Sequence, residues 1–423
     1  MSDRRLTTAE AARRLGVKPA TVYAYVSRGL LSRERAPDGR TSTFDPAEID
    51  RLARPGRPRR GRRPAPELVL PSALTAIADG LPWYRGLPVP ELAATRGFEE
   101  VAAWLWTGRF PDPGPGPAWR AGEATLAAGR RAQAALPEAA LPLERIRVLA
   151  AALAAGDELR LELHPAAVTA AGRALIAGLV DCLPRQGPAP PAEGAIAGRL
   201  WAGLSSLDPE PELVGTLDAA LVLLADHELA ASTVAARVAA SVRADPYAVA
   251  SAGLAVVSGT LHGGASLGIE ALLAEIDRPD RAAGGGEGQP RERAVGVVGA
   301  RLRRGERLRG FGHRLYPDGD PRAGVLLERL RAAAAGSPRL AAVEALLEAA
   351  ARRGLPEPNV DLALAALAHV TAMTRGAAEA IFAVARTAGW IAHALEEYDR
   401  NTPIRPRAVY TGPPVGAAAR IRP

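Results

Sequence analysis

The chain has 423 residues, 48% of them hydrophobic and only 4% aromatic, so two or three domains built mostly from helix-forming Ala and Leu are expected. A single cysteine, Cys182, excludes an internal disulfide framework and suits a reducing cytoplasm. No run of about 18 uncharged apolar residues and no signal-peptide pattern occur. A large, cytoplasmic, all-α protein is therefore predicted.

The positive charge is concentrated at one end of the chain. The whole chain carries +7, but residues 1–66 alone carry +9, from 16 basic and 7 acidic side chains. This asymmetry indicates a separate basic module at the N-terminus.

Residues 1–53 read as two short helices joined by a glycine turn. A Thr-Thr pair can cap the first helix, and the second is expected to place Val22, Tyr23 and Val26 on one face. The stretch RGLLSRERAPDGRTSTFDPAEI predicts a small hairpin wing and a closing helix. Together these elements form a helix-turn-helix pattern.

The pattern is similar to DNA-binding domains of the MerR and excisionase type. That resemblance implies that four residues contact DNA: Thr21, Tyr23, Ala24 and Arg28. A helix-turn-helix used only for protein contact is the alternative.

Residues 54–66, RPGRPRRGRRPAP, have no hydrophobic periodicity and are predicted to be a linker. Their Gly-Arg-Pro centre, flanked by arginines, also resembles an AT-hook that lies in a narrow minor groove. Arginines bind DNA phosphates whatever the base sequence. A solvated charge run would look the same.

From residue 67 onward the pattern is helical. A proline begins the segment LPVPELAATRGFEEVAAWLWTG, and its apolar residues share a face: Leu92, Phe98, Val101, Ala102 and Leu105.

His262 is expected just before a helix. It lies in SGTLHGGASLGIEALLAEI, where apolar spacing predicts a helix after Gly264 and two glycines let the backbone approach a ligand. The positive end of a helix disfavours an imidazolium, so His262 would stay neutral and donate a hydrogen bond. A capping or core histidine would show the same pattern.

The stretch RGFGHRLYPDGDPR, residues 309–322, combines a glycine loop with His313 and Arg322. Free backbone N–H groups and the five arginines at 301–309 suit a phosphate-bearing ligand, and Arg322 can clamp a carboxylate through its planar fork. A polar surface turn is the other interpretation.

Asp361 follows Asn359 in LPEPNVDLALAALAHV, which predicts an N-cap and a carboxylate in the first turn of an apolar helix. The helix dipole would keep that carboxylate ionised as a base. An ordinary first-turn acid has the same pattern.

Three further candidates are His227, predicted on a helical segment in LLADHELAAS, and two cations in apolar surroundings, Arg386 and Arg405. A buried arginine needs a partner, and a ligand carboxylate is one. The remaining histidines are interpreted as packing or surface residues: His164, His369 and His393.

Six motifs together resemble citrate synthase, in that family's order and at its spacing, over residues 67–423. They are ADHE with His227, LHGGA with His262, GFGHRLY and DPRA with His313 and Arg322, PNVD with Asp361, ARTAGWIAH with Arg386, and RPRAVYTGP with Arg405.

The resemblance implies an all-α fold with two domains that close over substrate. The large domain would comprise residues 67–262 and 373–423, and the small domain residues 263–372. It also implies a homodimer in which Arg405 is supplied across the interface.

By the same resemblance, Asp361 removes a proton from the methyl group of acetyl-CoA, and neutral His262 stabilises the enol. His313 polarises the keto carbon of oxaloacetate. The carboxylates of oxaloacetate would be held by His227, Arg322, Arg386 and Arg405. CoA would be contacted by Arg307, Arg309, Gly310, Phe311 and Gly312. Acetyl-CoA is a cosubstrate, and no permanently bound cofactor or metal is expected.

Two departures from the family pattern concern the shape of the pocket. Pro317 stands where many members have Lys, and Leu-Ala follows Asp361 where many have Phe-Tyr. Acetyl-CoA and propionyl-CoA, the latter giving 2-methylcitrate, therefore both remain as donors. The N-terminal module supports a further hypothesis, a regulator that senses citrate-cycle metabolites, although sensing does not require Asp361.

Overall fold

The computed structural model describes residues 5–15, 17, 19–27, 31–36, 41–46, 48–49, 69–112, 118–189, 194–259, 265–278, 290–408 and 410–411. It divides into two compact units, Met1–Pro71 and Ser72–Pro423. The predicted linker at 54–66, Arg28, His262 and the side chain of Ala24 lie outside the described residues. Among the residues described, no helix is both long and apolar enough to cross a lipid bilayer.

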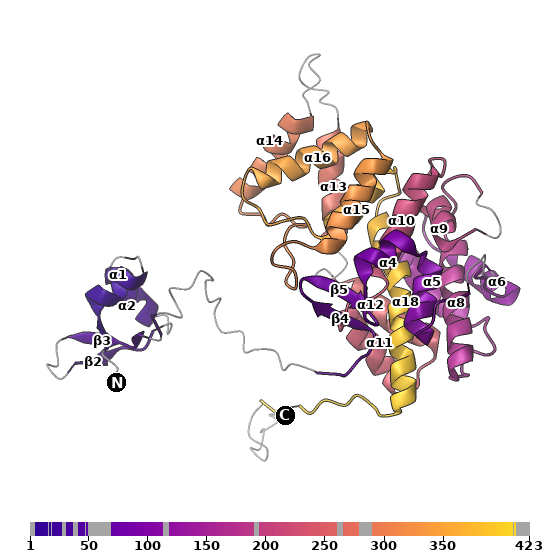
Figure 1. Ribbon diagram of the computed structural model, residues 1–423, viewed down its shortest axis with the longest axis horizontal. Helices are drawn as coiled ribbons and strands as arrows, with labels where there is room; N and C mark the ends of the chain where they lie inside the picture. The colour runs from indigo at the N-terminus through magenta and orange to yellow at the C-terminus, as the bar shows by residue number, and fades with distance from the viewer. Residues whose placement is uncertain are drawn as a thin grey trace, which may run out of the picture. The chain divides into compact units, whose positions relative to one another are not determined.

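The N-terminal unit contains the two predicted helices and the predicted hairpin (Figure 1). Its elements are β1 (Leu6–Thr7), α1 (Thr8–Leu15), α2 (Pro19–Ser27), β2 (Glu34–Arg35) and β3 (Ser42–Phe44). Strand β3 is central and antiparallel to both neighbours, with Leu6 opposite Phe44 and Glu34 opposite Thr43.

Helix α1 begins with a reciprocal cap, because the Thr7 N–H donates to the Glu10 carboxylate at 2.8 Å and the Glu10 N–H donates to the Thr7 hydroxyl at 3.4 Å. The prediction that Val22, Tyr23 and Val26 share one face of α2 is wrong for Tyr23. Val22 is fully buried, but Tyr23 is 43% exposed and Tyr25 packs against the core instead. Neighbouring residues on a helix point about 100° apart, so Val22 and Tyr23 cannot both face the core.

The second unit is helical, with one small antiparallel sheet in the order β4-β5-β6. The strands are β4 (Thr75–Ala78), β5 (Leu81–Tyr84) and β6 (Leu87–Pro88). The helices are α4 (Val89–Thr95), α5 (Phe98–Thr107), α6 (Glu123–Ala134), α7 (Pro142–Ala154), α8 (Pro165–Asp181), α9 (Ile196–Leu204), α10 (Pro211–Leu224), α11 (Ala231–Ser241), α12 (Pro246–Val257), α13 (Ala265–Asp277), α14 (Pro290–Arg303), α15 (Pro321–Ala333), α16 (Pro338–Ala351), α17 (Val360–Val370) and α18 (Ala377–Arg400).

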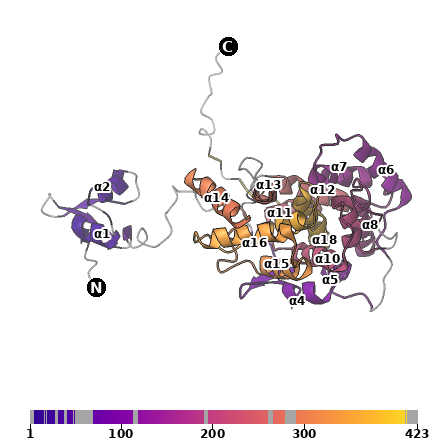
Figure 2. The same cartoon turned by 90° about the horizontal axis from the view of Figure 1, so that it is seen from above.

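Helix α18 is the centre of this unit. It packs against α5, α7, α8, α10, α11 and α12, and its middle turns are fully buried. Helices α13–α17 pack on one another and join the rest mainly through α17 on α18 and α15 on α10. Figures 1 and 2 show α13–α16 gathered together, away from α5–α9. The division into a large and a small domain remains a prediction, and this grouping is compatible with it.

The predicted apolar stripe near residue 100 is buried throughout. The stripe spans two helices, α4 and α5, rather than one. Gly97 is the N-cap of α5, and its N–H donates to the Glu100 carboxylate at 2.9 Å. The buried residues are Leu92, Phe98, Val101, Ala102 and Leu105.

Helix α18 approaches the end of α10 more closely than a side chain would allow. The Gly389 N–H donates to the Ala225 carbonyl at 2.9 Å. A Cβ at Gly389 would meet that same carbonyl oxygen and would lie 2.6 Å from an Asp226 carboxylate oxygen. The glycine therefore lets α18 hold the loop that follows α10.

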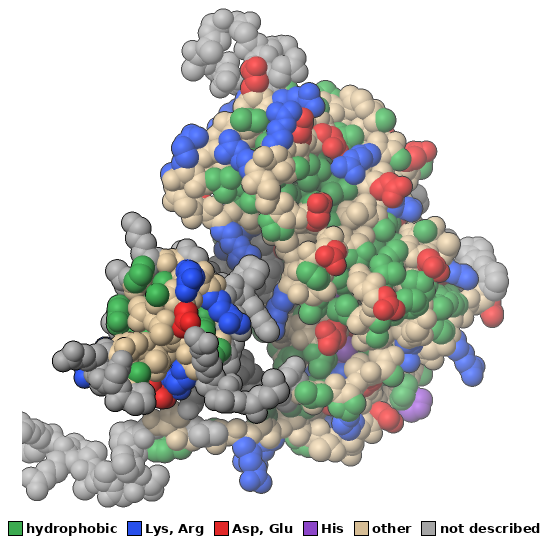
Figure 3. Space-filling view, turned by 60° about the vertical axis from the view of Figure 1, so that its left-hand side comes forward, with side chains coloured by type: hydrophobic (Ala, Val, Ile, Leu, Met, Phe, Trp, Pro, Cys, Tyr) green, Lys and Arg blue, Asp and Glu red, His purple; other side chains and the backbone are tan. Residues whose placement is uncertain are grey.

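Basic and acidic side chains are interspersed over α13–α16 on the face shown in Figure 3. Ion pairs such as Arg301–Glu275 and Arg331–Glu344, each 2.8 Å, account for part of this pattern. Exposed pairs of this kind stabilise a fold by less than about 1 kcal/mol each.

Candidate active site

A cavity of about 540 Å³ lies where α18 meets the loops that precede α11, α15 and α17. Five residues predicted from the sequence line it: His227, His313, Arg322, Asp361 and Arg386. Segments up to about 160 residues apart in sequence thus contribute to one cavity.

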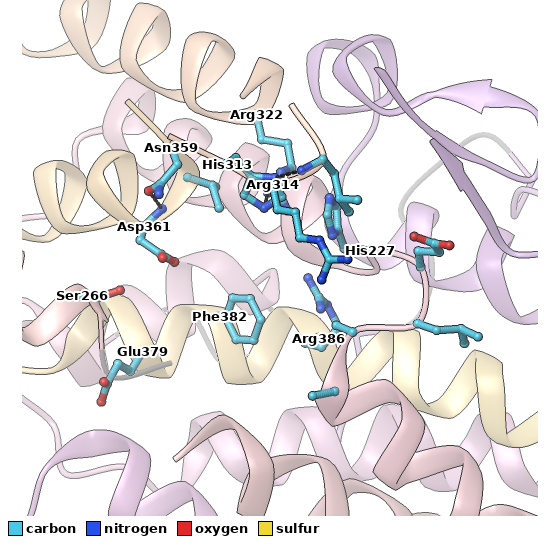
Figure 4. Close-up of a pocket in the computed structure, with 16 residues that line it drawn as sticks. His227, Ser266, His313, Arg314, Arg322, Asn359, Asp361, Glu379, Phe382 and Arg386 are labelled. Carbon is cyan, nitrogen blue, oxygen red and sulfur yellow. Dashed lines mark hydrogen bonds between the residues drawn. The ribbon is translucent and has the colours of Figure 1, made fainter. Parts of the chain in front are cut away.

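The cavity has two chemically distinct ends, on either side of Phe382 in Figure 4. The cationic end contains His227, His313, Arg314, Arg322 and Arg386. The acidic end contains Ser266, Asp361 and Glu379. A small anionic compound can bind at the first end while a carboxylate acts as a base at the second.

His227 does not lie on a helix, so that prediction is wrong. Helix α10 ends at Leu224 and α11 begins at Ala231. Within the connecting loop, Glu228 adopts a φ of 52°, a left-handed conformation that ends helical pairing. The Tyr84 hydroxyl donates to the Asp226 carbonyl at 2.7 Å and accepts from the Asp226 N–H at 3.0 Å.

The Asp226 side chain anchors this loop to β4 and α18. One carboxylate oxygen accepts from the Thr75 hydroxyl at 2.5 Å and lies 3.2 Å from His393 Nε2. Burial alone would raise the pKa of Asp226, but His393 and Arg386 together lower it below the ordinary value. His393, interpreted from sequence as a packing or surface residue, is thus a fully buried ionic partner.

His227 is held as a neutral imidazole. Its Nε2 lies 2.9 Å from the Tyr316 hydroxyl, and its ring meets the His313 ring edge-on at 5.6 Å between centroids. Burial strongly lowers the pKa of His227, and the positive charges of Arg322 and Arg386 lower it further.

The predicted glycine loop before His313 is present, but the Gly312 N–H is not free, because it donates to the Glu357 carbonyl at 2.7 Å. Gly310 and Gly312 have φ values of 90° and 76°, and a Cβ at Gly310 would lie 2.9 Å from Ile269. Asn359 anchors the loop, because its N–H donates to the Gly310 carbonyl at 2.9 Å and its amide donates to the Gly312 carbonyl at 3.0 Å. The loop is therefore fixed to the start of α17.

The His313 ring is oriented by a hydrogen bond from the backbone two residues later. Its Nδ1 accepts from the Leu315 N–H at 3.2 Å, which favours the tautomer with the proton on Nε2; that Nε2 also lies 3.5 Å from Arg322 Nη2. Burial and the charge of Arg322 both lower the pKa of His313. A neutral ring with Nε2–H can donate a hydrogen bond to a ligand oxygen.

Arg322 lies in the first turn of α15 and forms a two-pronged pair with Asp320. Its Nε and Nη2 donate to the two Asp320 oxygens at 2.9 and 2.8 Å. Asp320 also accepts from the Val360 N–H at 3.1 Å. Among the described residues Arg322 Nη1 has no hydrogen-bond partner, so that nitrogen is available to a ligand.

Arg386 is almost fully buried in the middle of α18. Its Nε donates to the Leu224 carbonyl at 2.8 Å, and its guanidinium lies 4.6 Å from the centre of the Phe382 ring. Neither terminal nitrogen is hydrogen-bonded within the part of the chain that the structure describes. A buried guanidinium of this kind favours binding of a carboxylate.

The predicted cap of α17 is present. The Asn359 side chain accepts from the N–H groups of Asp361 and Leu362 at 3.1 and 3.4 Å. Burial raises the pKa of the Asp361 carboxyl to about 6; the charge of Arg322 lowers this pKa and that of Asp320 raises it. Asp361 is thus a stronger base than an ordinary aspartate and is still mostly ionised at neutral pH.

Several predicted site residues do not line the cavity. Arg307 and Arg309 are exposed on the loop before His313, and the Phe311 side chain is buried in the core. Arg405 is exposed on the segment after α18. Helix α13 begins at Ala265, three residues after His262.

Four residues that shape the cavity were not predicted from the sequence: Arg314, Asp320, Glu379 and Phe382. The sequence does contain an indication for Glu379, because a lone acid in the apolar run AAEAIFAVA would be buried if the run forms a core helix. It contains another for Asp320, because Asp before Pro-Arg is typical of a helix N-cap.

The chain matches the family model described as "Citrate synthase, C-terminal domain" over residues 67–407, and a helix-turn-helix domain model over residues 5–57. Citrate synthase 2 of Bacillus subtilis is 32% identical over 366 residues, covering 81% of this chain and 93% of that protein. A 2-methylcitrate synthase of Corynebacterium glutamicum is 28% identical, covering 80% and 92%. The crystal structure of citrate synthase from Pyrobaculum aerophilum is similar with a TM-score of 0.65 at 26% identity, covering 90% of this chain and 95% of that one.

One family model accounts for most of the chain, and the cavity in that part brings together residues from four of the six motifs that suggested the same family. The chain belongs to the citrate synthase family and carries a helix-turn-helix domain ahead of the part that matches it.

Proposed function

We propose that this chain condenses acetyl-CoA with oxaloacetate and water to give citrate and CoA. The observation that carries the proposal is the cavity itself, in which a base of raised pKa faces a group of cations across Phe382. Relatives named citrate synthase support the same reaction.

The cationic end would bind oxaloacetate. The terminal nitrogens of Arg386 and the Nη1 of Arg322 have no hydrogen-bond partner among the described residues and can each donate to a carboxylate, and neutral His227 can add a hydrogen bond. His313 would donate its Nε2–H to the ketone oxygen and so make the ketone carbon more electrophilic.

The acidic end would activate the donor. Asp361 takes a proton from the methyl carbon of acetyl-CoA, and the resulting enol carbon bonds to the ketone carbon of oxaloacetate, whose oxygen becomes a hydroxyl. By family resemblance, His262 hydrogen-bonds the thioester oxygen of the enol. Water then cleaves the C–S bond, which releases citrate and the CoA thiol. By the same resemblance, the loop at 307–312 contacts CoA.

The direct test is release of the CoA thiol by the purified full-length protein. Release is expected with oxaloacetate plus acetyl-CoA or propionyl-CoA, and the ratio of kcat/KM values decides between citrate and 2-methylcitrate. A relative named 2-methylcitrate synthase keeps the second product as an alternative. Absence of thiol release with both donors would contradict a condensing enzyme.

A homodimer that shares Arg405 fits the surface of α11. Val238, in the last turn of α11, and Val242, just after the helix, are 39% and 63% exposed and form an apolar patch of the kind that pairs with a second copy. The Ile404 N–H donates to the Ser241 hydroxyl at 3.0 Å. The segment that carries Arg405 therefore starts beside this apolar patch.

Mixing two inactive variants tests this arrangement. If Arg405 acts in the partner's site, Asp361→Asn and Arg405→Met proteins, each inactive alone, form mixed dimers in which one site has both residues. Random pairing of equal amounts then restores about one quarter of wild-type activity. No recovery after verified subunit exchange would place Arg405 outside the partner's site.

A second proposed function is DNA binding by the N-terminal unit. Tyr23 is exposed on α2 and is held by the Thr8 hydroxyl at 3.3 Å, so its phenol can reach a phosphate or a base. The predicted basic linker would add contacts to phosphate.

Binding should depend steeply on salt. If three phosphates are neutralised, the full-length chain loses about 40-fold in affinity for mixed-sequence duplex between about 50 and 200 mM salt. A gel-shift titration measures this, with a chain that begins at residue 69 as the control. Equal binding by the shortened chain, or none by the full chain at low salt, would remove this function.

A further inference from the structure

Glu379 is a second carboxyl group at the acidic end of the cavity. It lies in the first turn of α18, lines the cavity and is only 5% exposed. Figure 4 places it with Ser266 and Asp361, on the side of Phe382 away from Arg386. Its carboxylate makes no hydrogen bond or ion pair with any residue that the structure describes.

Glu379 is not needed to cap its own helix. The N–H groups of Gly376 and Ala378, at the start of α18, donate instead to the Glu270 carboxylate at 2.7 and 3.2 Å. The helix terminus is therefore already satisfied by another element.

The surroundings of Glu379 oppose its charge. Burial raises the pKa of its carboxyl to about 7, with further contributions from Glu270 and Asp361. A buried carboxyl without a partner is costly to the fold. The Ser266 hydroxyl, on a residue only 3% exposed, lines the same end, so a ligand there meets two polar groups rather than an apolar wall.

This polar end is where the acyl group must lie, if the proposed function is correct, because Asp361 has to reach its carbon 2. We propose that Glu379 selects the acyl donor by accepting a hydrogen bond from a hydroxyl group on that carbon. A 2-hydroxyacyl-CoA such as glycolyl-CoA would then be preferred over propionyl-CoA, which has a methyl group in the same place.

The reaction is the same condensation with a substituted donor. Carbon 2 of glycolyl-CoA loses a proton to Asp361 and bonds to the ketone carbon of oxaloacetate, whose oxygen takes a proton. Water then cleaves the thioester, so that glycolyl-CoA, oxaloacetate and water give hydroxycitrate and the CoA thiol.

The two donors differ only by hydroxyl against methyl, which makes them a matched pair. The hydroxyl group of glycolyl-CoA donates a hydrogen bond to the buried Glu379 carboxylate. The methyl group of propionyl-CoA instead displaces water from that carboxylate and leaves it without a hydrogen-bond partner. Sites built to bind a substrate hydroxyl reject the analogue that lacks it strongly, and we expect a ratio of kcat/KM values of about 100 in favour of glycolyl-CoA.

The experiment measures thiol release by the full-length protein with oxaloacetate and three donors: acetyl-CoA, propionyl-CoA and glycolyl-CoA. Glu379→Met should bring the glycolyl-to-propionyl ratio close to one, and Glu379→Gln should keep part of the preference. Glu212→Met is the control, because Glu212 is an exposed acid in the first turn of α10.

The outcomes separate this inference from the function on which it rests. A wild-type ratio of one or less, with acetyl-CoA turned over normally, overturns the role of Glu379 alone. A high ratio that neither Glu379 variant changes overturns it as well. No thiol release with any of the three donors contradicts the condensing function itself. If Glu379→Met does not fold, the wild-type ratio and the Glu379→Gln ratio decide.

Discussion

Replacing Asp361 with Asn should lower kcat for thiol release about 1,000-fold, because general-base catalysis contributes about 10²–10⁴-fold. Asn has nearly the same shape but cannot take a proton. The KM for oxaloacetate should hardly change, since Asp361 lies at the acidic end, away from the arginines. Steady-state kinetics at saturating oxaloacetate measure the effect.

The pH profile and the stability of Asp361→Asn provide its controls. In the wild type the base is active when deprotonated, so activity should rise with pH through about 6, the pKa of Asp361. The raised pKa also means that the fold disfavours the charged form above that pH. The neutral Asn variant should therefore melt no lower than the wild type at pH 8. More than a tenth of wild-type kcat in the variant would exclude Asp361 as the base.

Replacing Arg386 with Met should damage oxaloacetate binding rather than the proton transfer. Removing one partner of a buried charge pair costs about 2–5 kcal/mol, which corresponds to a loss of about 30-fold to several thousand-fold in kcat/KM for oxaloacetate. The reason is that the Arg386 terminal nitrogens face the cavity without another partner among the described residues. Oxaloacetate titration by calorimetry and by kinetics measures the loss.

Two further variants show whether the loss is specific to the site. Arg386→Lys keeps the charge but loses the planar fork, and should cost less than Arg386→Met. Arg331→Met removes an exposed arginine of α15 that pairs with Glu344 on the surface, and should leave the kinetics unchanged. An Arg386→Met protein with wild-type KM for oxaloacetate would contradict the carboxylate-binding role.

Features governed by neighbouring residues were predictable from the sequence. Asn359 two residues before Asp361 predicts a cap, and the cap is present. Gly310 and Gly312 beside His313 predict a glycine loop, and both residues have positive φ. In each case the physical cause, a side-chain acceptor or a missing Cβ, lies within a few residues of its effect.

Features governed by distant contacts were not predictable in this way. The apolar spacing around His227 continues through LLADHELAAS without Gly or Pro, so the sequence favours an unbroken helix. The helix ends because Tyr84, 142 residues earlier, takes both backbone groups of Asp226. The burial of Glu379 could not be predicted from the sequence for the same reason, because it depends on helices that only the tertiary structure brings together.

The hydrogen bonds at the beginning of the helical unit also bear on how two genes could have been joined. The Ala73 N–H donates to Glu396 at 2.7 Å, and the Thr75 hydroxyl donates to the Asp226 carboxylate that supports the His227 loop. A module fused upstream of these residues leaves both hydrogen bonds in place, whereas a junction a few residues later would remove the support of the loop that carries His227. A fusion junction therefore keeps these hydrogen bonds only if it lies upstream of Ala73, and the helix-turn-helix domain, which matches its family over residues 5–57, lies upstream of that point.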